Sequence, residues 1–213
     1  MQHGGHSDDS VLRCIGPVIQ NGAHPVVRIP VGRFDMASRA LDFGAEAVIA
    51  PMINTLEDAQ AFAGSMKFPP LGSRSWGPTR AMVFRGMGDA NSYFQIANGE
   101  TLAIAMIETM EALAIADDIL ALDGIDGVFV GPSDFSIAWS NSALVDPRHD
   151  GMTAILRDIA SRARKAGKFA ASFGMDGPHA KFLAGLGFQL IAISTDTGCL
   201  TAGADAMVAA AKA

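Results

Sequence analysis

Two short apolar runs, each followed at once by an acidic residue, constrain the fold of this chain more than any other feature. Residues 103–109 read Ala-Ile-Ala-Met-Ile-Glu-Thr and include Glu108, while residues 127–134 end in Gly-Pro-Ser-Asp, with Asp134 last. The segment between them, 110–122, has helical patterning. An acid just past the carboxyl end of each of two neighbouring strands is how an α/β barrel builds a cation site. The pattern therefore indicates a divalent-metal enzyme, because buried carboxylates need a positive partner.

Further apolar runs have the character of parallel strands that are covered on both faces. They lie at 25–30, 47–52, 169–174 and 188–194, and helical patterns lie at 34–43, 55–67, 90–97, 152–166, 177–186 and 201–213. Six strand–helix units fit a TIM (β/α)₈ barrel that lacks its first two strands better than they fit an open sheet. A doubly wound nucleotide-binding sheet is the minor alternative, since no Gly-rich phosphate fingerprint follows any strand. Residues 1–213 are expected to form one partial barrel domain.

The connecting segments carry weaker signals. A helix that starts after Ser7 is expected to kink or to be interrupted at Gly16-Pro17. Residues 68–80, with several glycines, prolines and arginines, predict a structured loop over a site or at a subunit contact. The segment after Asp134 is predicted to be a loop through Trp139 and Pro147.

Composition and charge exclude several classes of protein. A net charge of −6 argues against a surface for nucleic acids or anionic membranes, which need clustered Lys and Arg. No apolar run has the length of a membrane span, and we expect no signal peptide. Cys14 and Cys199 lack metal-binding spacing, so we expect two buried, reduced thiols in a cytoplasmic protein.

Several of these segments together resemble the HpcH/HpaI family of class II, metal-dependent pyruvate aldolases. The matching segments occur in the same order along the chain: 25–30, 50–52, 69–74, 106–109, 124–134 and 194–197. The resemblance implies a barrel of the phosphoenolpyruvate/pyruvate superfamily. It also implies a homo-oligomer, a trimer or hexamer, in which the last helix (about 201–213) packs on a neighbouring subunit.

The same resemblance implies roles for individual residues. Glu108 and Asp134 match the carboxylate ligands of Mg²⁺, Mn²⁺ or Co²⁺, and Arg28 matches the arginine that contacts the keto oxygen of pyruvate and steadies the enolate. His3 matches the general base. The substrate-binding positions that follow from the motifs are Met106, Gly131, Pro132 and the backbone amides of Ser133 and Asp134.

Two departures from the family pattern stand out. The aspartate that orients the matching histidine would fall one position before Met1, which we interpret as an internal methionine of an N-terminally truncated chain. Met106 stands where several members have a glutamine near the bound pyruvate, although methionine also occurs there.

The function predicted is that of a lyase, which cleaves a 4-hydroxy-2-oxo acid reversibly to pyruvate and an aldehyde. Two rivals stay open: a CoA-ester lyase of the malyl- or citramalyl-CoA type, and an inactive barrel fragment that serves as an assembly module. Glu108 and Asp134 have an alternative interpretation as helix caps, and Arg28 as the partner of a barrel carboxylate. Arg74 binds the aldehyde or is a structural loop residue. Trp76, Trp139 and Phe135 line the acceptor pocket or an interface, and the sequence leaves both open. Ser172 and Gly174 are expected to shape the pocket through backbone groups, and Thr195 and Asp196 follow the last strand, where Asp196 is expected to cap the final helix.

Overall fold

The computed structural model describes residues 1–212, and its centre is one parallel sheet. The six strands follow one another across the sheet in chain order. They are β1 (Val26–Arg28), β2 (Ala47–Ala50), β3 (Leu102–Ile107), β4 (Gly127–Val130), β5 (Phe169–Gly174) and β6 (Leu190–Ile193). All five pairs of neighbours are parallel. The predicted α/β class and the order of the strands are therefore confirmed.

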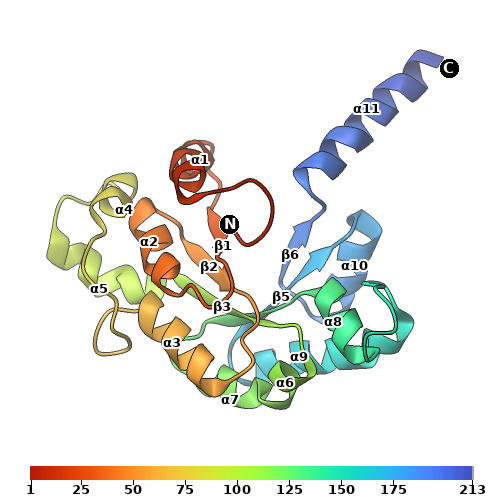
Figure 1. Ribbon diagram of the computed structural model, residues 1–213. Coiled ribbons are helices and arrows are strands. Elements are labelled where there is room, and N and C mark those ends of the chain that lie inside the picture. Colours follow the sequence, from red (N-terminus) through yellow and green to blue (C-terminus); the bar gives the residue numbers. More distant parts are fainter. Residues whose placement is uncertain (213) are drawn as a thin grey trace.

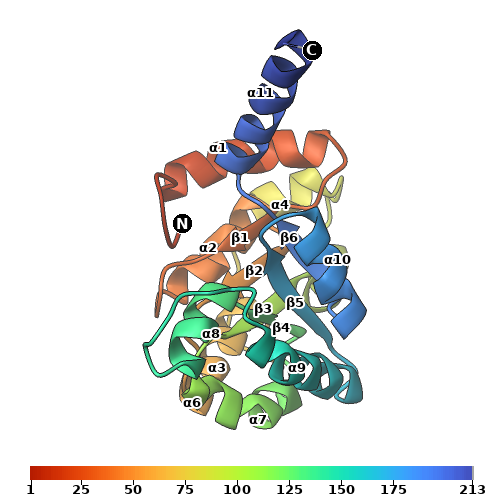
Figure 2. The same cartoon turned by 90° about the vertical axis from the view of Figure 1, so that its right-hand side faces the viewer.

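Most helices that connect the strands cover one face of the sheet, which curls (Figure 1). The helical elements are α1 (Asp8–Gln20), α2 (Asp35–Phe43), α3 (Leu56–Met66), α4 (Thr79–Phe84), α5 (Ala90–Glu100), α6 (Met110–Ala114), α7 (Ala116–Ala121), α8 (Pro132–Trp139), the 3₁₀ turn η1 (Asp150–Met152), α9 (Thr153–Lys165), α10 (Gly177–Leu186) and α11 (Asp196–Lys212). Helix α11 projects away from the rest of the molecule in both views (Figures 1 and 2). Within residues 1–212, none of the helices has the length and apolar character needed to cross a bilayer.

The two faces of the sheet form separate clusters of buried side chains, because side chains alternate between faces along a strand. Ala103, Ala105 and Ile107 of β3 belong to a large cluster that includes the covering helices. Ile104 and Met106 belong to a small cluster on the inner, concave face. The register extends this inner face across the sheet, since Met106 lies beside Phe129, and Phe129 beside Ala171. The inner face is the one that carries the cavity described below.

Several local predictions are wrong. The segment after Asp134 begins as helix α8 and not as a loop, because Pro132 suits the first turn and Asp134 adds an acid to it. Helix α1 continues through Gly16-Pro17 without interruption. Pro17 is exposed, so the carbonyl that its ring leaves without a donor can be hydrated. The helix predicted over 110–122 is divided at Ile115 into α6 and α7.

The two cysteines are also placed differently from the prediction. Cys14 and Cys199 are both exposed free thiols. Cys14 lies in α1, whose buried side chains Val11 and Ile15 turn the opposite way, and Cys199 lies in α11, which has no buried residue. Neither thiol is part of a core, so their exposure reflects the faces of two helices that pack on one side or not at all.

Candidate active site at the carboxyl ends of the strands

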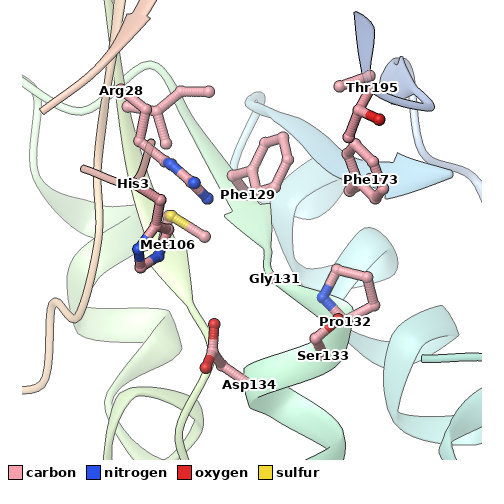
Figure 3. A pocket seen from close by; sticks show the side chains of 12 residues that line it. His3, Arg28, Met106, Phe129, Gly131, Pro132, Ser133, Asp134, Phe173 and Thr195 are labelled. Carbon is pink, nitrogen blue, oxygen red and sulfur yellow. The ribbon is translucent and has the colours of Figure 1, made fainter. Parts of the chain in front are cut away.

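A cavity of about 480 Å³ opens on the concave face at the carboxyl ends of the strands. Side chains from most of the strands and from the segments that follow them point into it (Figure 3). The lining residues are His3, Arg28, Ile49, Met106, Phe129, Gly131, Pro132, Ser133, Asp134, Phe173, Ala192 and Thr195. Ligand sites of parallel α/β folds form at this end of the strands. The cavity thus brings together all of the predicted site residues except Glu108, which lies directly behind its wall.

Glu108 follows β3 and is 1% exposed. Its Oε1 accepts a hydrogen bond from the backbone N–H of Met52, at 2.7 Å. Met52 has a φ of 53°, a left-handed conformation that is unfavourable for a side chain of this type. Strain of this kind is characteristic of functional sites, where surrounding structure holds it in place. The strained turn after β2 therefore aims an amide at the Glu108 carboxylate.

The charge of Glu108 is poorly compensated. Burial raises the pKa of its carboxyl, the bond from Met52 and the charge of Arg28 oppose the rise, and the charge of Asp134 adds to it. No ion pair within residues 1–212 includes Glu108, Asp134 or Arg28. The buried Glu108 carboxylate and the nearby charge of Asp134 form a local excess of negative charge.

Gly131 allows this close arrangement. A Cβ at that position would lie 2.6 Å from Glu108 Oε2 and 2.9 Å from Met106 Cε. Any side chain would therefore push α8 away from the Glu108 carboxylate. With glycine at position 131, α8 starts directly against Glu108 and places Asp134, which is exposed, in its first turn.

The same helix start provides backbone donors. Gly131 is the N-cap of α8 and makes no side-chain capping bond, and Pro132 has no N–H. The first-turn amides of Ser133 and Asp134, two residues that line the cavity, therefore lack the oxygen that a Ser, Thr or Asp cap would supply. Such amides, together with the helix dipole, favour a small anion such as a carboxylate.

Arg28 and His3 stand at the side of the cavity formed by β1 (Figure 3). Arg28 is half-buried, and its guanidinium points into the cavity. The amino group of Met1 donates a hydrogen bond to the carbonyl oxygen of Arg28 at 2.8 Å, which holds the first residues beside β1. His3 is exposed and lines the cavity from this segment.

The side chains at the site fit a divalent cation. Carboxylate oxygens are hard ligands of the kind that Mg²⁺ and Mn²⁺ prefer, and a cation would neutralise the excess negative charge of Glu108 and Asp134. Within residues 1–212, no group of three or more His, Cys, Asp or Glu side chains is arranged to hold a metal. Two protein carboxylates would leave further coordination positions for an oxygen-rich substrate and water.

Several residues considered from the sequence lie elsewhere. Arg74 is buried, pairs with Asp42 at 2.7 Å and lies 4.5 Å from the centre of the Phe68 ring, so its role is structural. Ser172 is buried and donates a hydrogen bond to the Val130 carbonyl at 3.0 Å. Trp76, Phe135 and Trp139 are absent from the twelve lining residues of the cavity.

The apolar wall of the cavity, which includes Phe129 and Phe173, was not predicted from the sequence. Both residues share the inner face of the sheet with Met106, but β4 is apolar on both faces, so its sequence does not show which residues point inward. The backbone amide of Met52 was also missed, because a main-chain donor leaves no residue-type signal in a sequence.

Known proteins match this chain over most of its length. It is 36% identical to a hydroxypyruvate/pyruvate aldolase of Rhizorhabdus wittichii, an alignment that covers all of this chain and 83% of that protein. It is 30% identical to a 4-hydroxy-2-oxo-heptane-1,7-dioate aldolase of Klebsiella pneumoniae, over 98% of this chain and 77% of that protein.

A crystal structure of a HpcH/HpaI aldolase/citrate lyase family protein from Burkholderia cenocepacia is similar in fold, with a TM-score of 0.87 at 26% identity. That comparison covers 100% of this chain and 84% of the other. Residues 10–202 match the family described as HpcH/HpaI aldolase/citrate lyase. The chain therefore belongs to the HpcH/HpaI aldolase/citrate lyase family.

Proposed function

We propose that this protein is a metal-dependent pyruvate aldolase, a lyase that reversibly cleaves a 4-hydroxy-2-oxo acid to pyruvate and an aldehyde. The observation that carries the proposal is the buried Glu108 carboxylate, which lies against the start of α8, directly behind the wall of a cavity lined by Asp134 and Arg28. The names of the relatives, which include two aldolases of 2-oxo acids, support the same reaction class.

Each predicted site residue has a role in this proposal. Glu108 and Asp134 would hold Mg²⁺, Mn²⁺ or Co²⁺, which supplies Lewis acidity toward the oxygens of the 2-oxo acid. The amides of Ser133 and Asp134 bind the substrate carboxylate, with Gly131 and Pro132 shaping the turn. Arg28 donates to the keto oxygen, where negative charge develops. Met106 packs beside the bound 2-oxo acid.

His3 is proposed to handle the proton. In the cleavage direction it accepts the proton of the C4 hydroxyl, and the C4–O⁻ electrons form the aldehyde carbonyl as the C3–C4 bond breaks. The electron pair of that bond passes to the enolate of pyruvate, whose keto oxygen faces Arg28. The proton that His3 accepted is then returned to C3, directly or through water, which gives pyruvate and restores neutral His3.

The finer details of architecture belong to the same proposal. The curled sheet and its order of strands favour a barrel of the (β/α)₈ type, in the phosphoenolpyruvate/pyruvate superfamily. Helix α11 has no buried residue and exposes Leu200, Met207 and Val208, so we place it against a neighbouring subunit of a homo-oligomer. A trimer or hexamer is the assembly that the family resemblance implies.

The experiment measures release of pyruvate from a panel of 4-hydroxy-2-oxo acids, with and without Mn²⁺, for the native chain and for Glu108→Gln. We expect metal-dependent turnover that falls at least about 10³-fold in the variant, which corresponds to about 4 kcal/mol of transition-state stabilisation. Binding of Mn²⁺, followed by its electron paramagnetic resonance signal, should weaken in parallel.

The same variant has a second readout that is independent of activity. Because Glu108 is a buried and poorly compensated charge, Glu108→Gln should raise the free energy of unfolding of the metal-free protein by about 1–3 kcal/mol. Native metal dependence that survives in Glu108→Gln would refute the proposed ligand. Absence of turnover in the native chain with Mn²⁺ bound would refute the proposed reaction.

A further inference from the structure

The cavity has two chemically different sides. His3, Arg28 and Asp134 are the three ionisable side chains among the twelve lining residues. Phe129, Phe173 and Ala192 form an apolar wall, and Figure 3 shows Phe173 on the side away from His3, with Phe129 between Arg28 and Phe173. The proposed function uses the polar side for the 2-oxo acid, which leaves the apolar wall for the second reactant.

The register of the strands makes this wall continuous. Phe173 of β5 lies directly beside Ala192 of β6, so their side chains share the inner face of the sheet. Phe129 of β4 lies beside Ala171, one inward position along β5 from Phe173. Two rings flanked by alanines leave an apolar recess in which a substituent of a few carbons would be covered by protein.

Thr195 adds little polarity to this side of the cavity. Its Oγ1 already accepts a hydrogen bond from the N–H of Gly198, at 3.1 Å, at the start of α11. The hydroxyl retains one proton to donate, which suits a neutral oxygen but does not neutralise a carboxylate.

The cations near the strand ends are committed elsewhere. Arg33, after β1, pairs with Asp35 at 2.8 Å, and Arg148, after α8, pairs with Asp176 at 2.7 Å. Neither arginine lines the cavity. Arg28 faces the 2-oxo acid in the proposed function, and Asp134 would repel a second carboxylate. An acidic acceptor would therefore lose its hydration without gaining a charged partner.

From this arrangement, and resting on the proposed function, we infer that the acceptor aldehyde is neutral and carries an apolar substituent. Phe129, Phe173 and Ala192 are its binding wall, and Phe173 determines acceptor specificity. The relative from Klebsiella pneumoniae is named for a heptane-1,7-dioate, a substrate with a carboxylate at each end. Cleavage of such a substrate releases an aldehyde that carries a carboxylate. This chain should discriminate against an acceptor aldehyde with a carboxylate.

The test compares two acceptors of the same chain length, butanal and 4-oxobutanoate, in aldol addition to pyruvate with Mn²⁺. We expect kcat/KM for butanal to exceed that for 4-oxobutanoate at least tenfold. Phe173→Ala should lower kcat/KM for butanal about tenfold, whereas Phe173→Leu, the matched control that retains an apolar side chain, should keep most of it.

Exchange of the pyruvate methyl protons in D₂O tests the proposed aldolase function separately from the acceptor specificity, because enolate formation needs no acceptor. Unchanged exchange in Phe173→Ala, together with the loss on butanal, supports a specificity role. If the native protein exchanges the pyruvate protons and its kcat/KM for 4-oxobutanoate equals or exceeds that for butanal, the inferred specificity is wrong and the proposed function still holds. If Arg148→Ala then removed the activity on 4-oxobutanoate, Arg148 would be the carboxylate receptor. No exchange in the native chain would overturn the proposed function and the inference with it.

Discussion

The outer face of the sheet is packed for stability, whereas the inner face leaves room for a cavity. The outer face is closed by helices, and side chains such as Leu41 and Phe62 are fully buried there. The inner face has a much smaller buried cluster, which ends at an open cavity where Ile49 and Phe129 are 8% and 6% exposed. One face gains stability from dense apolar contact, and the other leaves room beside a buried carboxylate.

This difference shows where the fold tolerates unfavourable features. The raised pKa of Glu108 and the left-handed backbone of Met52 both occur on the inner side, at the ends of strands. Both reduce stability, and the dense outer face offsets them. Substitutions on the two sides should therefore separate stability from activity.

The largest effect should come from a matched pair of truncations. Leu41→Ala removes a fully buried side chain of the outer face and should cost about 3 kcal/mol of unfolding free energy. Ile49→Ala, on the inner face, should cost about half as much, since part of that side chain already borders open space. Urea denaturation measures both values.

Leu41→Ala should also leave the activity of the folded fraction unchanged. The comparison between the faces would fail if Ile49→Ala proved as destabilising as Leu41→Ala.

A smaller effect is expected where the loops after β2 and β3 are linked. The Thr109 hydroxyl donates a hydrogen bond to Asn54 Oδ1 at 2.7 Å, next to the bond between Met52 and Glu108. Asn54→Ala should weaken Mn²⁺ binding about tenfold, as loss of support behind a metal ligand commonly does.

Asn54→Asp, which keeps the acceptor oxygen, should retain more of the Mn²⁺ affinity than Asn54→Ala. Equal affinity in both variants and the native protein would show that this link does not position Glu108.

The smallest effect concerns His179 of α10, a buried polar group on the helical side. Its Nδ1 accepts a hydrogen bond from the Met175 N–H at 3.2 Å, and its Nε2 is buried without a partner within residues 1–212. Burial lowers the pKa of His179 below its usual 6.5, the charge of Arg148 lowers it further, and Asp176 opposes both. The unfolded chain then binds a proton that the folded chain excludes, so stability is lost as the pH falls below about 6.5.

Unfolding free energies between pH 7.5 and pH 5.5 test this. The decrease toward acid should be shallower for His179→Gln than for the native protein. An identical slope in both would assign the acid sensitivity to other groups.

The sequence was sufficient for the strands and for the positions of Glu108 and Asp134, because continuous apolar runs and their flanking acids are local signals. It was insufficient for the inner wall. In a strand that is apolar on both faces, such as β4, nothing local shows which alternate residues point inward. The partner of Arg74 is Asp42, 32 positions away, and only the packing of α2 beside the loop brings them together. The exposure of Cys14 likewise depends on how α1 packs.

Helix α11 has a consequence for the protein in dilute solution. Its 17 residues extend about 25 Å and have no buried side chain. A solitary helix of this length is marginally stable in water, so its order depends on what lies against it. If another copy of the chain supplies that surface, the folding of α11 depends on association between copies. The helix content of the protein then increases with protein concentration. Helix α11 is then stabilised by binding to another molecule, as a ligand is, and not by packing within its own domain.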